Sequence, residues 1–305
     1  MDFIEPVARV MKQIDTPDGV YAKQMAAKIG GIEGLCTFPV VAQMVLKILS
    51  SENYKMATVS AVINRDPALA AKIMRLANSA FFSRGKEVDS IDKAMVRLGR
   101  ANVVESVCAV ATMDMFPDVD GVGKDIRDHC AATAAICQEI VTDLLPSHKN
   151  GAFLCGLMHD VGKLMLIASG ESVYNTATEQ QRIASDAMVP VERAAFGYDH
   201  ALLAAQILSL WKFPDPIPLV VALHHEPALA YQNEEIGYVV AMCRIASQVD
   251  RQLAYNMVGV DEFVEILATG VDCAFAAVSE DYLLNKWETL SNARTQALSV
   301  FGPNG

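Results

Sequence analysis

The sequence lacks the features by which secreted and membrane proteins are usually recognised. Its seven cysteines include no Cys-x-x-Cys pair, and such an odd, scattered set predicts no disulfide framework and suits a reducing compartment. No segment reaches about 18 apolar residues without a charge, so we expect no membrane span. The first fifteen residues carry early acids and no uninterrupted apolar run, which predicts no signal peptide. A cytoplasmic location is therefore expected.

Positive charge is also scarce. The chain of 305 residues has 25 lysines and arginines against 36 aspartates and glutamates, a formal net charge of −11. Binding to a nucleic-acid duplex needs clustered lysines and arginines that neutralise phosphates. Direct binding to nucleic acid is therefore not expected.

Strict alternation of apolar and polar residues, the pattern of a half-buried strand, is almost absent. Apolar residues instead recur at steps of three and four, which predicts an all-α protein. Asp66 and Pro67 are typical of a helix start, and Ser90 is expected to cap a helix that Gly99 divides into two. Further helices are expected at about 124–145, 150–168, 171–186, 189–196, 199–211, 216–225, 235–252, 260–268 and 273–300.

The stretch "MFPDVDGVGKDI", residues 115–126, gathers one proline, two glycines and three aspartates between two helical patterns. We place a boundary between two helical lobes there. The predicted division is an N-terminal helical extension at 1–29, a first lobe at 30–117, a second lobe at 118–252 and C-terminal helices at 253–305.

All six histidines fall in the second lobe, and five of them stand at positions whose neighbours suggest one site, namely His129, His159, His200, His224 and His225. Asp125 and His129 are four residues apart on a predicted helix and share a face, and so do His159 and Lys163. Asp199 is expected to cap the helix that His200 begins. Five separate hydrogen-bonded core histidines are the alternative, but together the positions favour one shared site.

Imidazoles combined with carboxylates, here Asp125 and Asp160, suit a transition metal better than calcium. Iron, manganese, zinc or nickel are the candidates, and sites of mixed nitrogen and oxygen ligands often hold two ions that activate a water and clamp a phosphate. Lys163 could hold a phosphate oxygen as a point charge.

These motifs resemble a known family. "GLMHDVGKLML", "YDHALLAAQILSLWKFP" and "ALHHEPA" resemble the HD superfamily of metal-dependent phosphohydrolases, and "HDVGK" and "HHE" its HD-GYP branch, which hydrolyses cyclic-di-GMP. "TFPVVAQMVLKIL", "VINRDPALAAKIMRLANSAFF" and "SIDKAMVRLG" closely resemble the HDOD domain, a bacterial HD-related signalling output domain that generally lacks demonstrated catalysis. The resemblance covers about residues 30 to 252.

The resemblance implies roles for individual residues. Asp160 would bridge metal ions, Lys163 would contact substrate phosphate, and Asp125 stands where the enzymes tend to have a glutamate ligand. The remaining implied metal ligands are His129, His159, His200, His224 and His225.

Two departures from the enzyme pattern bear on catalysis. In "YVVAMCRIASQVD", Arg244 stands where the enzymes have a closing aspartate, and a guanidinium cannot ligate a metal. Asp250 lies six residues later and is expected on a different helical face, where it would be a poor substitute. Alternatively, the register is off by a residue or two and Arg244 is a surface residue. The Gly-Tyr-Pro loop of the HD-GYP enzymes is also missing after "HHE".

The sequence therefore predicts a bacterial, non-catalytic signalling protein that acts through protein partners. In a refinement of this hypothesis, Lys163 and Arg244 bind a phosphorylated nucleotide messenger without cleaving it. The alternative is a metal-dependent phosphohydrolase, a nucleotide or cyclic-dinucleotide phosphodiesterase in which Asp160 and Lys163 are catalytic.

Overall fold

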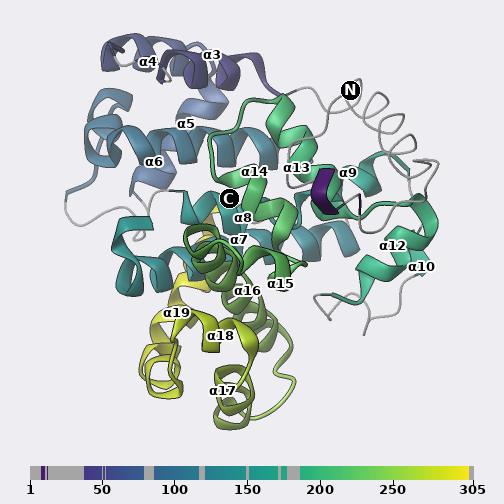
Figure 1. Cartoon of the computed structure of the whole chain (residues 1–305). Coiled ribbons are helices and arrows are strands. Elements are labelled where there is room, and N and C mark those ends of the chain that lie inside the picture. The colour runs from purple at the N-terminus through teal and green to yellow at the C-terminus, as the bar shows by residue number, and fades with distance from the viewer. Residues whose placement is uncertain are drawn as a thin grey trace.

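The structure is a computed structural model that describes residues 8–10, 12, 38–49, 51, 53–78, 86–116, 121–148, 151–170, 173–176 and 186–301. Within these ranges the regular elements are helices and there is no strand, which confirms the all-α prediction (Figure 1). No helix in the same ranges is both long enough and apolar enough to cross a membrane.

Four helices form the N-terminal part, at the upper left of Figure 1: α3 (Val40–Leu49), α4 (Met56–Ile63), α5 (Pro67–Asn78) and α6 (Ile91–Asp114). The predicted helix starts are confirmed. Asp66 Oδ1 accepts hydrogen bonds from the backbone N–H groups of Ala68 and Leu69, and Ser90 Oγ accepts one from Lys93. Gly99, with φ of 71°, kinks α6 in a conformation that favours glycine.

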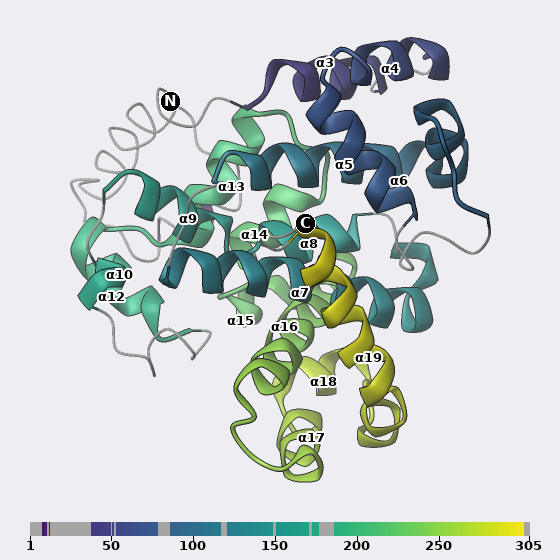
Figure 2. The same ribbon diagram turned by 180° about the vertical axis from the view of Figure 1, so that it is seen from behind.

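The next helix along the chain is α7 (Val122–Leu144), which packs against α8, α16 and α19, and further helices follow it (Figure 2). They are the short 3-10 helix η1 (Pro146–His148), α8 (Ala152–Met158), α9 (Val161–Ala168), α10 (Val173–Thr176), α12 (Met188–Phe196), α13 (His200–Leu210), α14 (Ile217–Leu223), α15 (Pro227–Ala230), α16 (Glu234–Tyr255), α17 (Val260–Ala268), α18 (Val271–Ala276) and α19 (Glu280–Phe301).

Two of the predicted helices are in fact pairs of helices. The predicted helix at 150–168 breaks at His159 and Asp160 into α8 and α9, and the one at 273–300 corresponds to α18 and α19. The predicted helix at 171–186 lies mostly outside the described residues. Because of this break, His159 and Asp160 lie between two helices rather than within one.

Buried apolar side chains form two clusters. One runs continuously from the N-terminal helices through α7, α8, α9, α13 and α14, and the other joins α7 to α16, α17, α18 and α19. The predicted boundary between residues 117 and 118 lies within residues 117–120, which the structure does not describe. Of residues 1–29 the structure describes 8–10 and 12. The division into lobes stays a prediction.

Two glycines allow the helices that carry the His-Asp pair to approach their neighbours. A Cβ at Gly162 would lie 2.0 Å from the carbonyl oxygen of His200, and one at Gly156 would lie 2.7 Å from the Cα of Ala134. Both contacts are far shorter than van der Waals distance, so only glycine fits. They bring α9 against α13 and α8 against α7.

The six described cysteines are free and buried, as expected for core thiols, whereas Cys36 lies outside the described residues. Near Cys108 the core also contains an acid. Glu105 is only 4% exposed, and its Oε1 accepts a hydrogen bond of 2.7 Å from the backbone N–H of Gly151. Burial raises the pKa of Glu105 to about 7.

Replacing Glu105 with glutamine should stabilise the protein in a pH-dependent way. The folded protein keeps the Glu105 proton to a higher pH than the unfolded chain, so wild-type stability falls between about pH 4.5 and about pH 7. At pH 8 we expect Glu105→Gln to be more stable by up to about 3 kcal/mol, and at pH 5 by much less. Urea unfolding at both pH values measures this, with the exposed Glu87→Gln as control. Equal pH profiles for Glu105→Gln and wild type would contradict the expectation.

Candidate metal centre and adjoining pocket

Five imidazoles gather around the buried carboxylate of Asp160. His159 and Asp160 occupy the break between α8 and α9, and His129 projects from α7. His200 is the first residue of α13, whose start Asp199 caps as predicted, by accepting a hydrogen bond from the backbone N–H of Leu202. His224 and His225 follow the end of α14. The structure thus brings together five predicted histidine ligands from four parts of the chain.

All five imidazoles are oriented in the same way. Each Nδ1 lies 2.6 or 2.7 Å from an oxygen acceptor: Asp250 Oδ2 for His129, Gly156 O for His159, Glu192 Oε2 for His200, Val221 O for His224 and Asp186 Oδ1 for His225. These acceptors place the proton on Nδ1 and leave Nε2 as the free nitrogen. Metal-binding histidines are held in the same way by their second ring nitrogen.

The Nε2 atoms form two groups that share Asp160. In the first group, ligand atoms of Asp160, His200, His224 and His225 all lie within 4.8 Å of one another, and in the second those of His129, His159 and Asp160 do. We call these the three-histidine group and the two-histidine group.

The donor atoms fit a transition-metal ion. Among the described residues, His159 Nε2, His224 Nε2 and Asp160 Oδ1 are buried and have no hydrogen-bond partner. Buried polar atoms are nearly always satisfied, so a cluster of three such atoms points to a bound cation. Nitrogen ligands with one carboxylate suit iron, manganese, zinc or nickel.

The three-histidine group has the better arrangement for an ion. His200 Nε2 lies 3.0 Å from His225 Nε2 and 3.0 Å from Asp160 Oδ1. Since both Nδ1 atoms face carboxylates, two nitrogen lone pairs would oppose each other at this distance unless a cation or a proton lies between them. Burial opposes a charge on His200, but Glu192 outweighs it and raises the pKa of His200 to about 9.

Glu192 is a residue that the sequence did not single out. Its side chain is fully buried, and its Oε2 accepts hydrogen bonds from both the backbone N–H and the Nδ1 of His200. The hydroxyl of Tyr174 donates to Oε1 of the same carboxylate. Glu192 therefore fixes the ring orientation of His200.

Burial lowers the pKa values of His159, His224 and His225, so these imidazoles are neutral at physiological pH. A metal requires this state, because only the neutral ring offers a lone pair, so His200, whose pKa is raised to about 9, would release its proton when a metal binds.

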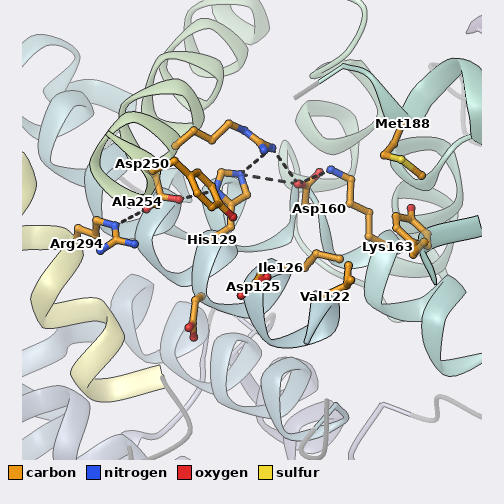
Figure 3. A pocket seen from close by; sticks show the side chains of 14 residues that line it. Val122, Asp125, Ile126, His129, Asp160, Lys163, Met188, Asp250, Ala254 and Arg294 are labelled. Atoms are coloured by element: carbon orange, nitrogen blue, oxygen red, sulfur yellow. Dashed lines mark hydrogen bonds and ion pairs between the residues drawn. The ribbon is translucent and has the colours of Figure 1, made fainter. Parts of the chain in front are cut away.

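The two-histidine group already has cations beside it. Lys163 Nζ lies 2.7 Å from Asp160 Oδ2, and a guanidinium nitrogen of Arg251 lies 3.8 Å from the same oxygen and 3.3 Å from His129 Nε2 (Figure 3). His129 Nε2 is also 3.1 Å from Ser247 Oγ. Burial alone would raise the pKa of Asp160, but Lys163 and the imidazoles hold it well below the usual range.

The structure does not bring Arg244 to Lys163. Its Nε donates to Asp272 Oδ1 at 2.8 Å, and a terminal nitrogen donates to the backbone carbonyl of His224 at 2.6 Å. Arg251 reaches Asp160 instead. The two arginines are seven residues apart, which is two turns of α16, so both lie on similar faces of the helix and the sequence pattern does not distinguish them.

Two other acids differ from their expected places. The expectation that Asp250 faces away from the site is wrong, since its Oδ2 contacts His129 and its Oδ1 accepts a 2.8 Å hydrogen bond from Arg294 of α19. Asp125 is exposed at the rim of the pocket and belongs to neither group of candidate ligands.

A cavity of about 260 Å³ adjoins the two-histidine group (Figure 3). Its charged lining consists of three basic side chains, Lys163, Arg251 and Arg294, and four acidic ones, Asp125, Asp128, Asp160 and Asp250. Apolar side chains such as Val122, Ile126 and Met188 complete the wall. The cavity can therefore accept a small polar ligand next to Asp160.

The fold and this site define an all-α protein built around a histidine–aspartate cluster. The HDOD domain model matches residues 35–227, and the chain belongs to the HDOD domain family.

Solved structures and one sequence relative are similar to this chain. A candidate phosphohydrolase from Shewanella amazonensis SB2B has 26% sequence identity and a TM-score of 0.72, over 92% of this chain and 98% of its own. A candidate signal transduction protein from Marinobacter aquaeolei VT8 has 19% identity and a TM-score of 0.63, over 93% of this chain and 67% of its own. An uncharacterised protein of Treponema pallidum is 20% identical over 250 residues, which make up 79% of this chain but 46% of that protein.

Removing the charge of Glu192 should weaken metal binding. Glu192→Gln removes the negative charge that faces His200 Nδ1, so we expect a 10- to 100-fold loss of metal affinity, measured by competition with a chromophoric chelator. Glu226→Gln is the matched control, because Glu226 pairs with Arg193 and with no imidazole. If both variants bind metal as wild type does, Glu192 does not orient the site.

Proposed function

We propose that this chain is a signalling protein of the HDOD family that binds one transition-metal ion, does not hydrolyse phosphate esters and acts through protein partners in the bacterial cytoplasm. The observation that carries this proposal is the placement of Arg251 and Lys163 against Asp160 Oδ2, where a second ion would need a ligand.

The proposed ion belongs to the three-histidine group. His200, His224, His225 and Asp160 Oδ1 would hold it, and Glu192 would keep His200 in the required tautomer. Such an ion supplies a positive charge that can polarise a bound oxygen. The orphaned Asp160 Oδ1 and His224 Nε2 support this placement.

A second ion in the two-histidine group would meet unfavourable electrostatics. His129 Nε2 lies near Arg251 and Ser247, and Asp160 Oδ2 already has Lys163. A dication about 4 Å from a guanidinium is repelled by several kcal/mol even at an effective dielectric constant of about 20. Enzymes that clamp a phosphate between two metal ions need both positions.

The cationic side chains suggest the ligand. We infer that Lys163 and Arg251, the latter in place of Arg244, hold the phosphate of a nucleotide messenger in the cavity. Arginine suits phosphate because its planar fork can donate two parallel hydrogen bonds.

A metal-dependent phosphohydrolase is the second candidate. Its support is that two groups of imidazoles, five in all, share Asp160, and that the similar Shewanella protein bears the name of a candidate phosphohydrolase. In that case Asp160 and Lys163 would be catalytic.

Metal content and hydrolysis separate the two candidates. Elemental analysis of protein purified without chelator should give about one transition-metal ion per chain, and Arg251→Asp should give about two, because it removes the guanidinium and adds a carboxylate. Arg251→Lys keeps the charge and should still bind one. Wild type with manganese, iron or zinc should not cleave bis-p-nitrophenyl phosphate or cyclic-di-GMP. Two ions in wild type together with steady cleavage would instead establish the enzyme.

A further inference from the structure

The two carboxylate oxygens of Asp160 face different surroundings. Oδ1 faces His200 Nε2 at 3.0 Å and His224 Nε2 at 3.7 Å, and has no hydrogen-bond partner among the described residues. Oδ2 faces Lys163 at 2.7 Å and Arg251 at 3.8 Å. One residue that is 2% exposed thus separates a candidate metal position from two cations.

The cavity lies on the side of the cations. Asp160, Lys163 and Arg251 line it, whereas no histidine of the three-histidine group does. An ion in that group would therefore adjoin the cavity across the Asp160 carboxylate.

The cations of the cavity are balanced by acids when no ion is bound. Lys163 and Arg251 face Asp160, and Arg294 pairs with Asp250 at 2.8 Å. With four acids against three bases in the lining, the cavity has no excess positive charge to attract an anion. A divalent ion bound to Oδ1 would make the net charge around the cavity positive, because it would neutralise Asp160. It would also weaken the electrostatic attraction of the Asp160 carboxylate for Lys163 and Arg251.

We propose that a metal ion in the three-histidine group and a phosphate group in the cavity bind cooperatively, with Asp160 as the coupling residue. This inference rests on the proposed one-ion site. The metal draws the charge of Asp160 to Oδ1, and Lys163 and Arg251 then turn to the phosphate oxygens. Because such coupling is reciprocal, the phosphate also tightens metal binding by the same factor.

Calorimetry with inorganic phosphate tests the coupling directly. Wild-type protein is compared after treatment with chelator and after loading with Mn²⁺ and removal of excess metal. We expect phosphate to bind at least about tenfold more tightly to the metal-loaded protein. Equal affinities, or no phosphate binding in either form, overturn the proposal.

Variants show whether Asp160 carries the coupling. Asp160→Asn lacks the charge that holds the cations, so after chelator treatment it should bind phosphate about as tightly as metal-loaded wild type. Lys163→Ala and Arg251→Ala should lose the gain that Mn²⁺ gives, whereas Lys93→Ala, which removes a lysine paired with Asp89 on the surface, should keep it. If Lys163→Ala and Arg251→Ala keep the full gain, phosphate binds the metal itself and the proposal fails.

The metal analysis and the phosphate titrations test the one-ion site and the cooperative binding separately. If elemental analysis finds no metal in wild type, the one-ion site fails, but the chelator-treated Asp160→Asn variant still tests whether the Asp160 charge blocks the cations. If metal binds and phosphate affinity does not change, the cooperative binding fails while the one-ion site stands.

Discussion

The structure of this site depends on one buried carboxylate, that of Asp160. An ionised carboxylate removed from water is stable only with close partners, and Asp160 has Lys163 on one oxygen and the three-histidine group at the other. The chain meets this constraint by breaking a helix at His159 and by placing Gly162 where α9 touches the carbonyl of His200. Further acids, Glu192 and Asp250, then orient the imidazoles whose Nε2 atoms face Asp160. Each oxygen of Asp160 thereby has a different chemical role.

The helices beyond the matched HDOD region are tied to the same site. Arg294 of α19 donates a hydrogen bond to Asp250, which in turn accepts a hydrogen bond from His129 Nδ1. Asp272 of α18 accepts a hydrogen bond from Arg244, which also donates one to the backbone carbonyl of His224. These two links connect the C-terminal helices to one histidine of each group.

Much of the fold and part of the site could be predicted from the sequence, because the relevant signals are local. Apolar residues every three or four positions predicted the helices, and Asp66, Ser90 and Asp199 cap helices where expected. The five histidines and Asp160 were also identified. Residues that act through tertiary contacts were not identified. Glu192 of α12 meets His200 of α13 across a turn, Arg294 lies 44 residues from its partner Asp250, and the helical repeat does not distinguish Arg244 from Arg251. The break at His159 was missed because apolar helix formers continue on both sides of it.

In the proposed site, Arg251 takes the place of a second ion while three histidines and Asp160 bind one ion. The most direct test is a crystal structure of protein grown with Mn²⁺ or Zn²⁺, with anomalous diffraction recorded at the absorption edge of the metal. The one-ion site predicts a single anomalous peak, ligated by His200, His224, His225 and Asp160 Oδ1, with the Arg251 guanidinium beside His129. A second peak between His129 and His159, with Arg251 displaced, would contradict it.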